Sequence, residues 1–182
     1  MRALVSVLLI VMLAFNASAQ DTIPEQIPEK PKKPIGEKLF YGGTVGLSFG
    51  NYSRIALYPY VGLRVSKKFR TAVQFGYEYI SDKRATTTFT ASNYGISVFG
   101  QYNIIPALYI HAEPAIYNYD AYYILGEDRV WVPFFYVGAG LHQRLGGRSV
   151  MYIQVKFDLI QDSNSPYNDW APFFDIGVGV GI

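Results

Sequence analysis

The sequence predicts an all-β fold, a closed eight-stranded antiparallel up-and-down transmembrane β-barrel. Apolar side chains occupy every second position through most of the chain after residue 40, as in the run from Met151 to Leu159. The chain is poor in charge, at 16%, and contains 16 Tyr and 17 Gly. Turn signals divide the alternating region into eight segments, each about as long as a tilted strand that crosses a bilayer.

The first 19 residues have the pattern of a cleaved signal peptide. Met1 and Arg2 form a minimal positive region, an apolar stretch follows from Ala3 to Phe15, and residues 17–19 form an Ala-Ser-Ala cleavage site. The apolar stretch is short for a helix that needs about 20 residues to span a membrane, so an anchor is the weaker alternative. Residues 20–39 contain four prolines among Glu and Lys, which predicts an extended Pro-rich periplasmic leader before a barrel of residues 40–182.

The expected strands comprise residues 40–50, 54–65, 69–80, 91–102, 107–119, 130–143, 149–161 and 171–182. Connections after the second, fourth and sixth strands are short, whereas those after the third, fifth and seventh are longer and more polar. This asymmetry is typical of outer-membrane barrels with both chain ends on the periplasmic side. Pro59 and Pro114 fall inside expected strands, where each removes a ladder donor, so we expect bulges or earlier strand ends there.

The composition of the polar face indicates whether the apolar face points outward to lipid or inward to the lumen. Small residues dominate the polar face of the first and last expected strands, including Gly42, Gly46, Gly177 and Gly179. Small side chains suit the narrow lumen of an eight-stranded barrel, and the apolar faces of eight strands would overfill it. A soluble lipocalin-like barrel, with the opposite sense, is therefore disfavoured. The expected lipid-facing residues are Val45, Leu47, Leu57, Val61, Leu63, Ile96, Val98, Val137, Ile153, Val155, Phe157, Ile176, Val178 and Val180.

A sheet that spans a bilayer has further requirements. Each unpaired backbone group in hydrocarbon costs several kcal/mol, so the first and last strands should pair and leave no edge. Aromatic side chains near strand ends are candidates for the two interfacial girdles. These candidates are Phe69, Tyr79, Tyr94, Tyr102, Trp131 and Trp170.

The inward face carries charged side chains that need partners. Buried charges are tolerable only when they are paired, so we expect Arg64 and Lys156 to be shared among four carboxylates. Tyrosine bulk would close the pore, which favours a plugged polar lumen over a conducting or ligand-binding one. The expected network consists of Arg64, Glu78, His111, Glu113, His142, Lys156, Asp158 and Asp175.

Two histidines are the candidates for chemistry. His111 and Glu113 share one face, and His142 on the next strand could approach them as part of a base and an orienting carboxylate. No inward serine lies beside either histidine in the sequence, and the chain has no cysteine to act as a nucleophile or thiolate ligand. We therefore assign no catalytic residue, no metal site and no cofactor.

Residues 40–182 resemble the small eight-stranded outer-membrane barrels, of the type represented by outer-membrane proteins A and X and by compact Bacteroidetes-type barrel domains. The resemblance rests on the strand count, the turn asymmetry and the terminal segment 170–182. That segment is similar to the C-terminal strand signal read by the barrel-assembly machinery, although it ends in Ile182 rather than an aromatic residue. The resemblance implies an outer-membrane location in a Gram-negative bacterium.

The expected function is that of a non-enzymatic integral outer-membrane barrel with a structural role or a surface role in its loops. A porin-like small-solute channel and an outer-membrane lipid-modifying enzyme are the alternatives. Expected partners are outer-membrane lipids, including lipopolysaccharide, and the assembly machinery; any extracellular partner would meet the long loops at 81–90, 120–129 and 162–170. The small net charge of +2 argues against nucleic acid.

Overall fold

The computed structural model describes residues 35–83, 88–120 and 129–181. The predicted signal peptide and most of the predicted leader lie outside these residues. So do parts of the loops predicted at 81–90 and 120–129. Within the described ranges, no helix is long and apolar enough to span a membrane.

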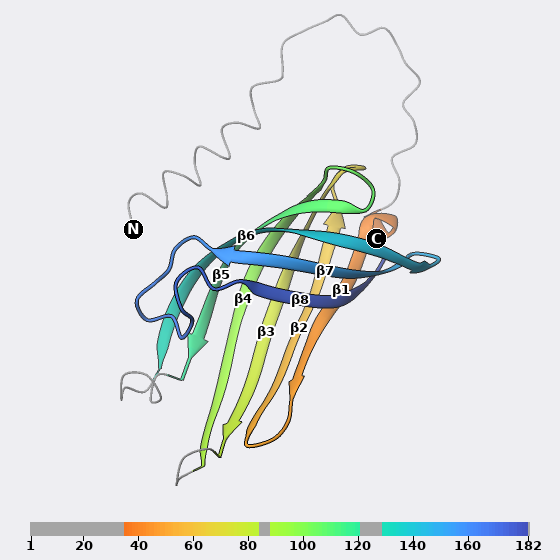
Figure 1. Cartoon of the computed structure of the whole chain (residues 1–182). Coiled ribbons are helices and arrows are strands. Elements are labelled where there is room, and N and C mark those ends of the chain that lie inside the picture. The colour runs from red at the N-terminus through yellow and green to blue at the C-terminus, as the bar shows by residue number, and fades with distance from the viewer. Residues whose placement is uncertain (1–34, 84–87, 121–128, 182) are drawn as a thin grey trace, which may run out of the picture. The chain divides into compact units, whose positions relative to one another are not determined.

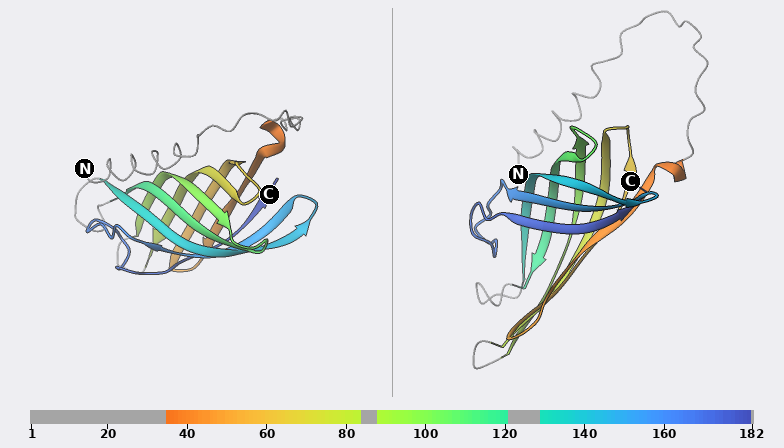
Figure 2. Two further views of the ribbon diagram at one scale, coloured as in Figure 1. Left: turned by 90° about the horizontal axis from the view of Figure 1, so that it is seen from above. Right: turned by 45° about the vertical axis from the view of Figure 1, so that its right-hand side comes forward.

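Eight antiparallel strands form a closed barrel in which each strand pairs with the next in the chain and β1 pairs with β8 (Figures 1 and 2). The predicted eight-stranded up-and-down barrel is therefore confirmed. A short 3-10 turn, Ile35–Lys38, precedes the first strand. The strands are β1 (Leu39–Ser48), β2 (Tyr52–Arg64), β3 (Phe69–Asp82), β4 (Phe89–Asn103), β5 (Leu108–Tyr119), β6 (Val130–Gly146), β7 (Ser149–Asp158) and β8 (Phe173–Val180).

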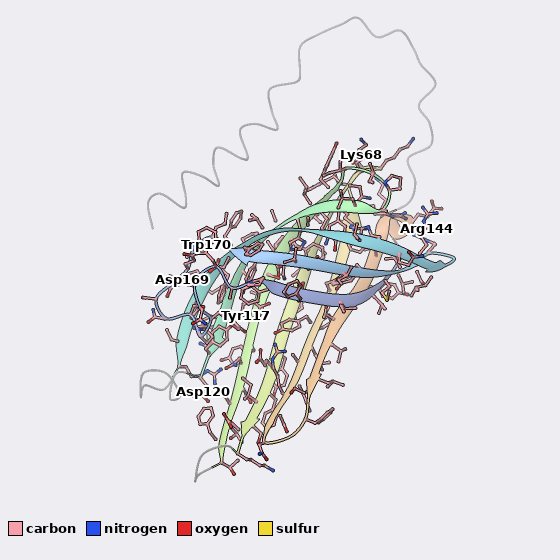
Figure 3. All side chains as sticks on the ribbon, viewed as in Figure 1. Lys68, Tyr117, Asp120, Arg144, Asp169 and Trp170 are labelled. Carbon is pink, nitrogen blue, oxygen red and sulfur yellow. The ribbon has the colours of Figure 1, made fainter. Side chains whose placement is uncertain are left out.

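The connections define two ends of the barrel. Short turns join β2 to β3, β4 to β5 and β6 to β7, and we call this the short-turn end. The other connections form the long-loop end, where residues 159–172 make the β7–β8 loop and the β1–β2 link is short. Figure 3 marks Lys68 and Arg144 toward the short-turn end, and Asp120 and Asp169 toward the long-loop end.

The bulges predicted at the two prolines do not occur. Pro59 pairs with Gly43 on β1, and Pro114 pairs with Phe135 on β6. On the other side of each strand, the β2–β3 ladder and the β4–β5 ladder each lack two residue pairs around the proline and then resume in the same register. Each proline removes a local donor on one side without inserting a residue, so both strands continue. The register shift that the described strands do contain lies beside the β6–β7 turn.

The seam between the first and last strands is short. β1 and β8 pair over four residue pairs, from Tyr41–Val180 to Thr44–Gly177. Beyond Thr44 the two strands diverge toward the long-loop end (Figure 1). A cavity of about 700 Å³ opens there, lined by residues of both strands and by side chains from the lumen. The predicted closure is thus confirmed for the half of the seam nearest the short turns.

Exposure alternates along the strands and separates an inner from an outer face. Side chains of the outer face are largely apolar and exposed, and those of the inner face are largely buried. The predicted lipid-facing residues all lie on the outer face, where each is exposed except the half-buried Val137 and Val155. Of the proposed girdle aromatics, Phe69 is half-buried and the other five are exposed.

Candidate functional site in the barrel lumen

The polar interior of the barrel is centred on Glu113, whose side chain is 1% exposed. Lys156 Nζ on β7 donates to Glu113 Oε2 at 2.8 Å, and Ser97 Oγ on β4 donates to Glu113 Oε1 at 2.6 Å. His111, which precedes Glu113 by two residues on β5, lies on the same face and contacts Oε2 through Nε2 at 2.9 Å. These three donors satisfy a carboxylate that burial would otherwise make costly.

Lys156 also joins β5 to β8 through a second carboxylate. Its Nζ lies 3.0 Å from Asp175 Oδ2, which also accepts a hydrogen bond from Gln154 Nε2 at 2.9 Å. Tyr109 OH in turn donates to Gln154 Oε1 at 2.8 Å. A buried ammonium shared by two carboxylates is compensated in the way that a buried charge requires.

A chain of hydrogen bonds runs from Glu113 toward the short-turn end and fixes the state of His111. Arg70 Nε donates to Gln101 Oε1 at 2.6 Å, so the amide nitrogen of Gln101 is the group that faces His111 Nδ1, at 3.1 Å. His111 Nδ1 is therefore an acceptor, and its Nε2 carries the proton donated to Glu113. The imidazole is held in its neutral form. Arg70 also contacts the ring of His142, which stacks on Tyr109 at 4.3 Å.

This arrangement differs from the predicted network at four residues, of which Arg64 and Asp158 lie outside the shared ion pairs. The sequence predicts that Arg64 takes part in the shared ion pairs, but its guanidinium contacts the backbone carbonyl of Glu37 beside the short-turn end. Asp158 accepts hydrogen bonds from the backbone N–H groups of Phe135, Ile160 and Gln161, so it ends β7 and anchors the following loop.

Glu78 forms an ion pair, although with a different arginine from the one predicted. Arg54 Nε and Nη2 donate to the two Glu78 oxygens at 2.8 and 3.1 Å, a bidentate pair near the long-loop end. Tyr58 OH adds a contact at 3.3 Å. The predicted approach of His142 to His111 is replaced by the link through Gln101 and Arg70.

Ser97, His111 and Glu113 are the residue types of a hydrolytic triad, but they are connected in the wrong order. A triad needs the histidine between the nucleophile and the carboxylate, accepting the nucleophile's proton. Here Glu113 lies in the middle, because Ser97 and His111 both donate to it. Ser97 is also buried, so its hydroxyl is not accessible to a substrate. The cluster is built to satisfy a buried carboxylate.

Aromatic rings occupy the lumen toward the long-loop end, where most of them also line the cavity beside the seam. Phe134 and Tyr136 on β6 stack at 5.2 Å, and Phe134 also contacts Tyr117 and Tyr119 on β5. Tyr167, from the β7–β8 loop, packs edge-on against Phe173 at 4.8 Å and against Phe134 at 6.3 Å. The loop therefore inserts a ring into the end of the barrel. We call these six residues the aromatic layer.

Glycines make room for the inward tyrosines by a repeated device. Four tyrosines lie directly opposite a glycine on the neighbouring strand: Gly42–Tyr60, Gly95–Tyr117, Gly140–Tyr109 and Gly177–Tyr152. A Cβ at any of these glycines would lie within 2.3–2.4 Å of an atom of that tyrosine or the backbone. The glycines thus allow large rings to lie across the lumen wall.

The short-turn end opens into a cavity of about 490 Å³, which we call the vestibule. Arg70 and His142 line both the vestibule and a small void of about 10 Å³ deeper in the barrel, which is about the size of one water. Lys156 in turn lines the larger cavity beside the seam. The polar network therefore separates the cavities at the two ends.

No protein-family model matches this chain, and a comparison with curated protein sequences finds no match. The two faces of the barrel are therefore the basis for proposing a function. Within the described part of the chain, no three His, Asp or Glu side chains come together as a metal site.

Sequence reasoning missed several lumen residues. Arg54, Arg70 and Ser97 have the same parity along their strands as the inward residues that were identified, so the alternation alone could have found them. Tyr167 lies in a loop without periodicity, and no pattern in the sequence indicates that its ring enters the barrel.

Proposed function

We propose that this protein is an integral outer-membrane β-barrel with an occluded lumen, and that its role is structural or belongs to its loops. The carrying observation is the outer face, where exposed apolar side chains occur on all eight strands. A water-soluble monomer rarely exposes a continuous apolar surface of this extent. The belt instead matches the apolar band that small membrane barrels present to lipid. Outer-membrane lipids, including lipopolysaccharide, and the assembly machinery acting on β8 are the proposed partners.

The lumen supports a non-conducting role. The Glu113 network crosses the interior between the vestibule and the cavity beside the seam, and the small void next to His111 and Arg70 holds about one water. Ions crossing this barrel would have to break buried ion pairs. We infer that the network acts as a structural plug that ties β4, β5, β7 and β8 together.

Heat-modifiable gel migration tests the folded barrel. The full chain, refolded in detergent, should run faster in its unheated form than after boiling, because a closed barrel resists dodecyl sulfate. A single band of unchanged mobility would contradict the proposal.

A small-solute channel is the second candidate, because the vestibule and the seam cavity approach the network from its two sides. Single-channel recording of the refolded protein in planar bilayers separates the two functions. The occluded barrel should give a flat baseline. Sustained current steps that Glu113→Gln alters would instead assign a channel.

We propose no enzymatic activity. A lipid-modifying enzyme needs an activated nucleophile near the membrane surface, whereas the serine of the His111 cluster is bound to Glu113 inside the lumen. Mass spectra of lipid A from cells with and without the protein should be identical. A mass change that depends on His111 would overturn this assignment.

A further inference from the structure

The vestibule gathers positive charge without matching negative charge. Its lining includes Arg64, Lys67, Lys68, Arg70 and Arg144, and contains no Asp or Glu. Among the described residues, none of these five forms an ion pair with a carboxylate. Like charges gathered in a concave site raise the local potential and favour an anion there.

Two of the arginines occupy facing positions on neighbouring strands. Arg64 and Arg70 are directly opposite each other in the β2–β3 ladder, with both side chains on the inward face. Like charges in this position destabilise a sheet unless something intervenes. Since β2 and β3 are otherwise regularly paired here, an anion between or beside the two guanidinium groups would remove the repulsion.

Both guanidinium groups lack a partner that a buried charged group normally has. Arg70 is only 5% exposed, yet its described hydrogen-bond partners are the neutral Gln101 and His142. The Arg64 Nε atom is buried and has no hydrogen-bond acceptor in the described structure. A buried cation without a counter-ion and a buried N–H without an acceptor are both costly, and an oxyanion would satisfy both.

We propose that the vestibule binds a phosphate-bearing anion. Arginine pairs present the forked donors that match phosphate oxygens, and the two lysines of the β2–β3 turn add charge at the rim. The volume of about 490 Å³ exceeds that of a bare anion and lies in the range of small-molecule sites. The rest of the lining is part polar and part apolar, with Phe69, Pro106, Ala107 and Val150 as its apolar side chains. We therefore expect the phosphate to belong to an organic molecule, either a soluble phosphate ester or a phospholipid headgroup.

Calorimetric titration of the folded full chain with pyrophosphate, in neutral detergent at low salt, tests the site. Arg70→Gln should weaken binding about tenfold, the value of one charge-assisted contact. Lys67→Gln/Lys68→Gln should weaken it as well, and added salt should lower the affinity of the unmodified protein. Arg148→Gln is the matched control, because Arg148 lies at the same end of the barrel but outside the vestibule lining. This variant should bind pyrophosphate as tightly as the unmodified protein does.

The result that overturns the proposal is absence of pyrophosphate binding, or equal affinities for the control and both vestibule variants. If Arg70→Gln does not fold, as judged by heat-modifiable migration, the lysine double variant in the exposed turn decides. Repeating the titration in micelles containing phosphatidylglycerol identifies the source. Competition by that lipid assigns a headgroup, and unchanged affinity assigns a soluble phosphate. The proposed site depends on the folded barrel and not on its cellular location. The titration therefore tests the site independently of the proposed outer-membrane location.

Discussion

Glu113 is the residue on which the interior of the barrel depends most. Its carboxylate holds Lys156, Ser97 and His111, so replacing it leaves a buried ammonium with Asp175 alone. We expect Glu113→Gln to lower the free energy of unfolding by about 3–5 kcal/mol, the usual result of removing one partner from a buried pair. Urea unfolding of the refolded barrel, followed by tryptophan fluorescence, measures the change.

Glu78→Gln is the matched control for that change. Its partner Arg54 is 32% exposed and can be hydrated when the carboxylate is lost. The loss should therefore be clearly smaller than for Glu113→Gln. Equal losses for the two variants would contradict the central position of Glu113 in the network.

The four facing glycine–tyrosine pairs in the lumen wall provide a second prediction at the residue scale. A Cβ at Gly95 would lie 2.3 Å from Tyr117 Cδ1 and 2.5 Å from the Ile116 carbonyl oxygen. Gly95→Ala should therefore cost about 1–3 kcal/mol through overpacking, as measured by the urea midpoint. Gly46→Ala is the control, because its nearest neighbour is the flexible end of Arg54 at 3.1 Å. A Gly95 variant as stable as the Gly46 variant would contradict the steric role of the pair.

At the residue scale, sequence reasoning identified faces better than partners. Alternation placed His111, Glu113, Lys156 and Asp175 inside, where the structure also has them. It could not determine partners, because these depend on register and on height along the barrel axis. Arg64 has inward parity but lies too near the short-turn end to reach the carboxylates.

At the scale of the strand, a substitution on the outer face tests whether that face contacts lipid or water. Val98 lies on β4, outward and 47% exposed. In a lipid vesicle, Val98→Lys should lower the free energy of unfolding by about 2–4 kcal/mol, since a cation near the bilayer midplane must be dehydrated. Gln143→Lys, on the outer face near the barrel end, should have little effect. Equal and negligible effects would contradict a lipid-facing surface.

The short β1–β8 pairing predicts that backbone amides within these two strands are unevenly protected from hydrogen exchange. Residues 41–44 pair with β8, whereas residues 45–48 have β2 as their only ladder partner. Backbone amides of 45–48 and 173–176 that face the seam should exchange with deuterium faster than those of 41–44 and 177–180. Hydrogen exchange read by mass spectrometry on the barrel in nanodiscs measures this difference. Uniform protection along β1 would show that the seam closes fully.

Local patterns predicted the strands well but not how they meet. Residues 107–119 and 130–143 were expected as strands and form β5 and β6, because strong alternation and clear turns mark them. The length of the β1–β8 pairing depends on residues more than 130 apart in the chain, which no local pattern reports. The sequence predicts a bulge or an earlier strand end at the two prolines, but each strand tolerates the lost donor because its ladder on the other side continues.

At the scale of the whole molecule, the two faces have different roles. The outer face presents apolar side chains around the barrel, while the interior is closed by the Glu113 network and the aromatic layer. A plugged interior supports the barrel wall from within, and the ends remain available for contact. The β7–β8 loop is tied to the interior through Tyr167, so its outer surface is presented on a rigid base.

Fractionation of a Gram-negative cell that expresses the full chain tests the central claim most directly. After separation of inner and outer membranes on a density gradient, followed by a urea wash, the protein should remain in the outer-membrane fraction and keep its heat-modifiable migration. Urea removes peripheral proteins but leaves an integral barrel in place. Recovery in the soluble periplasmic fraction, or release by the wash, would contradict the account.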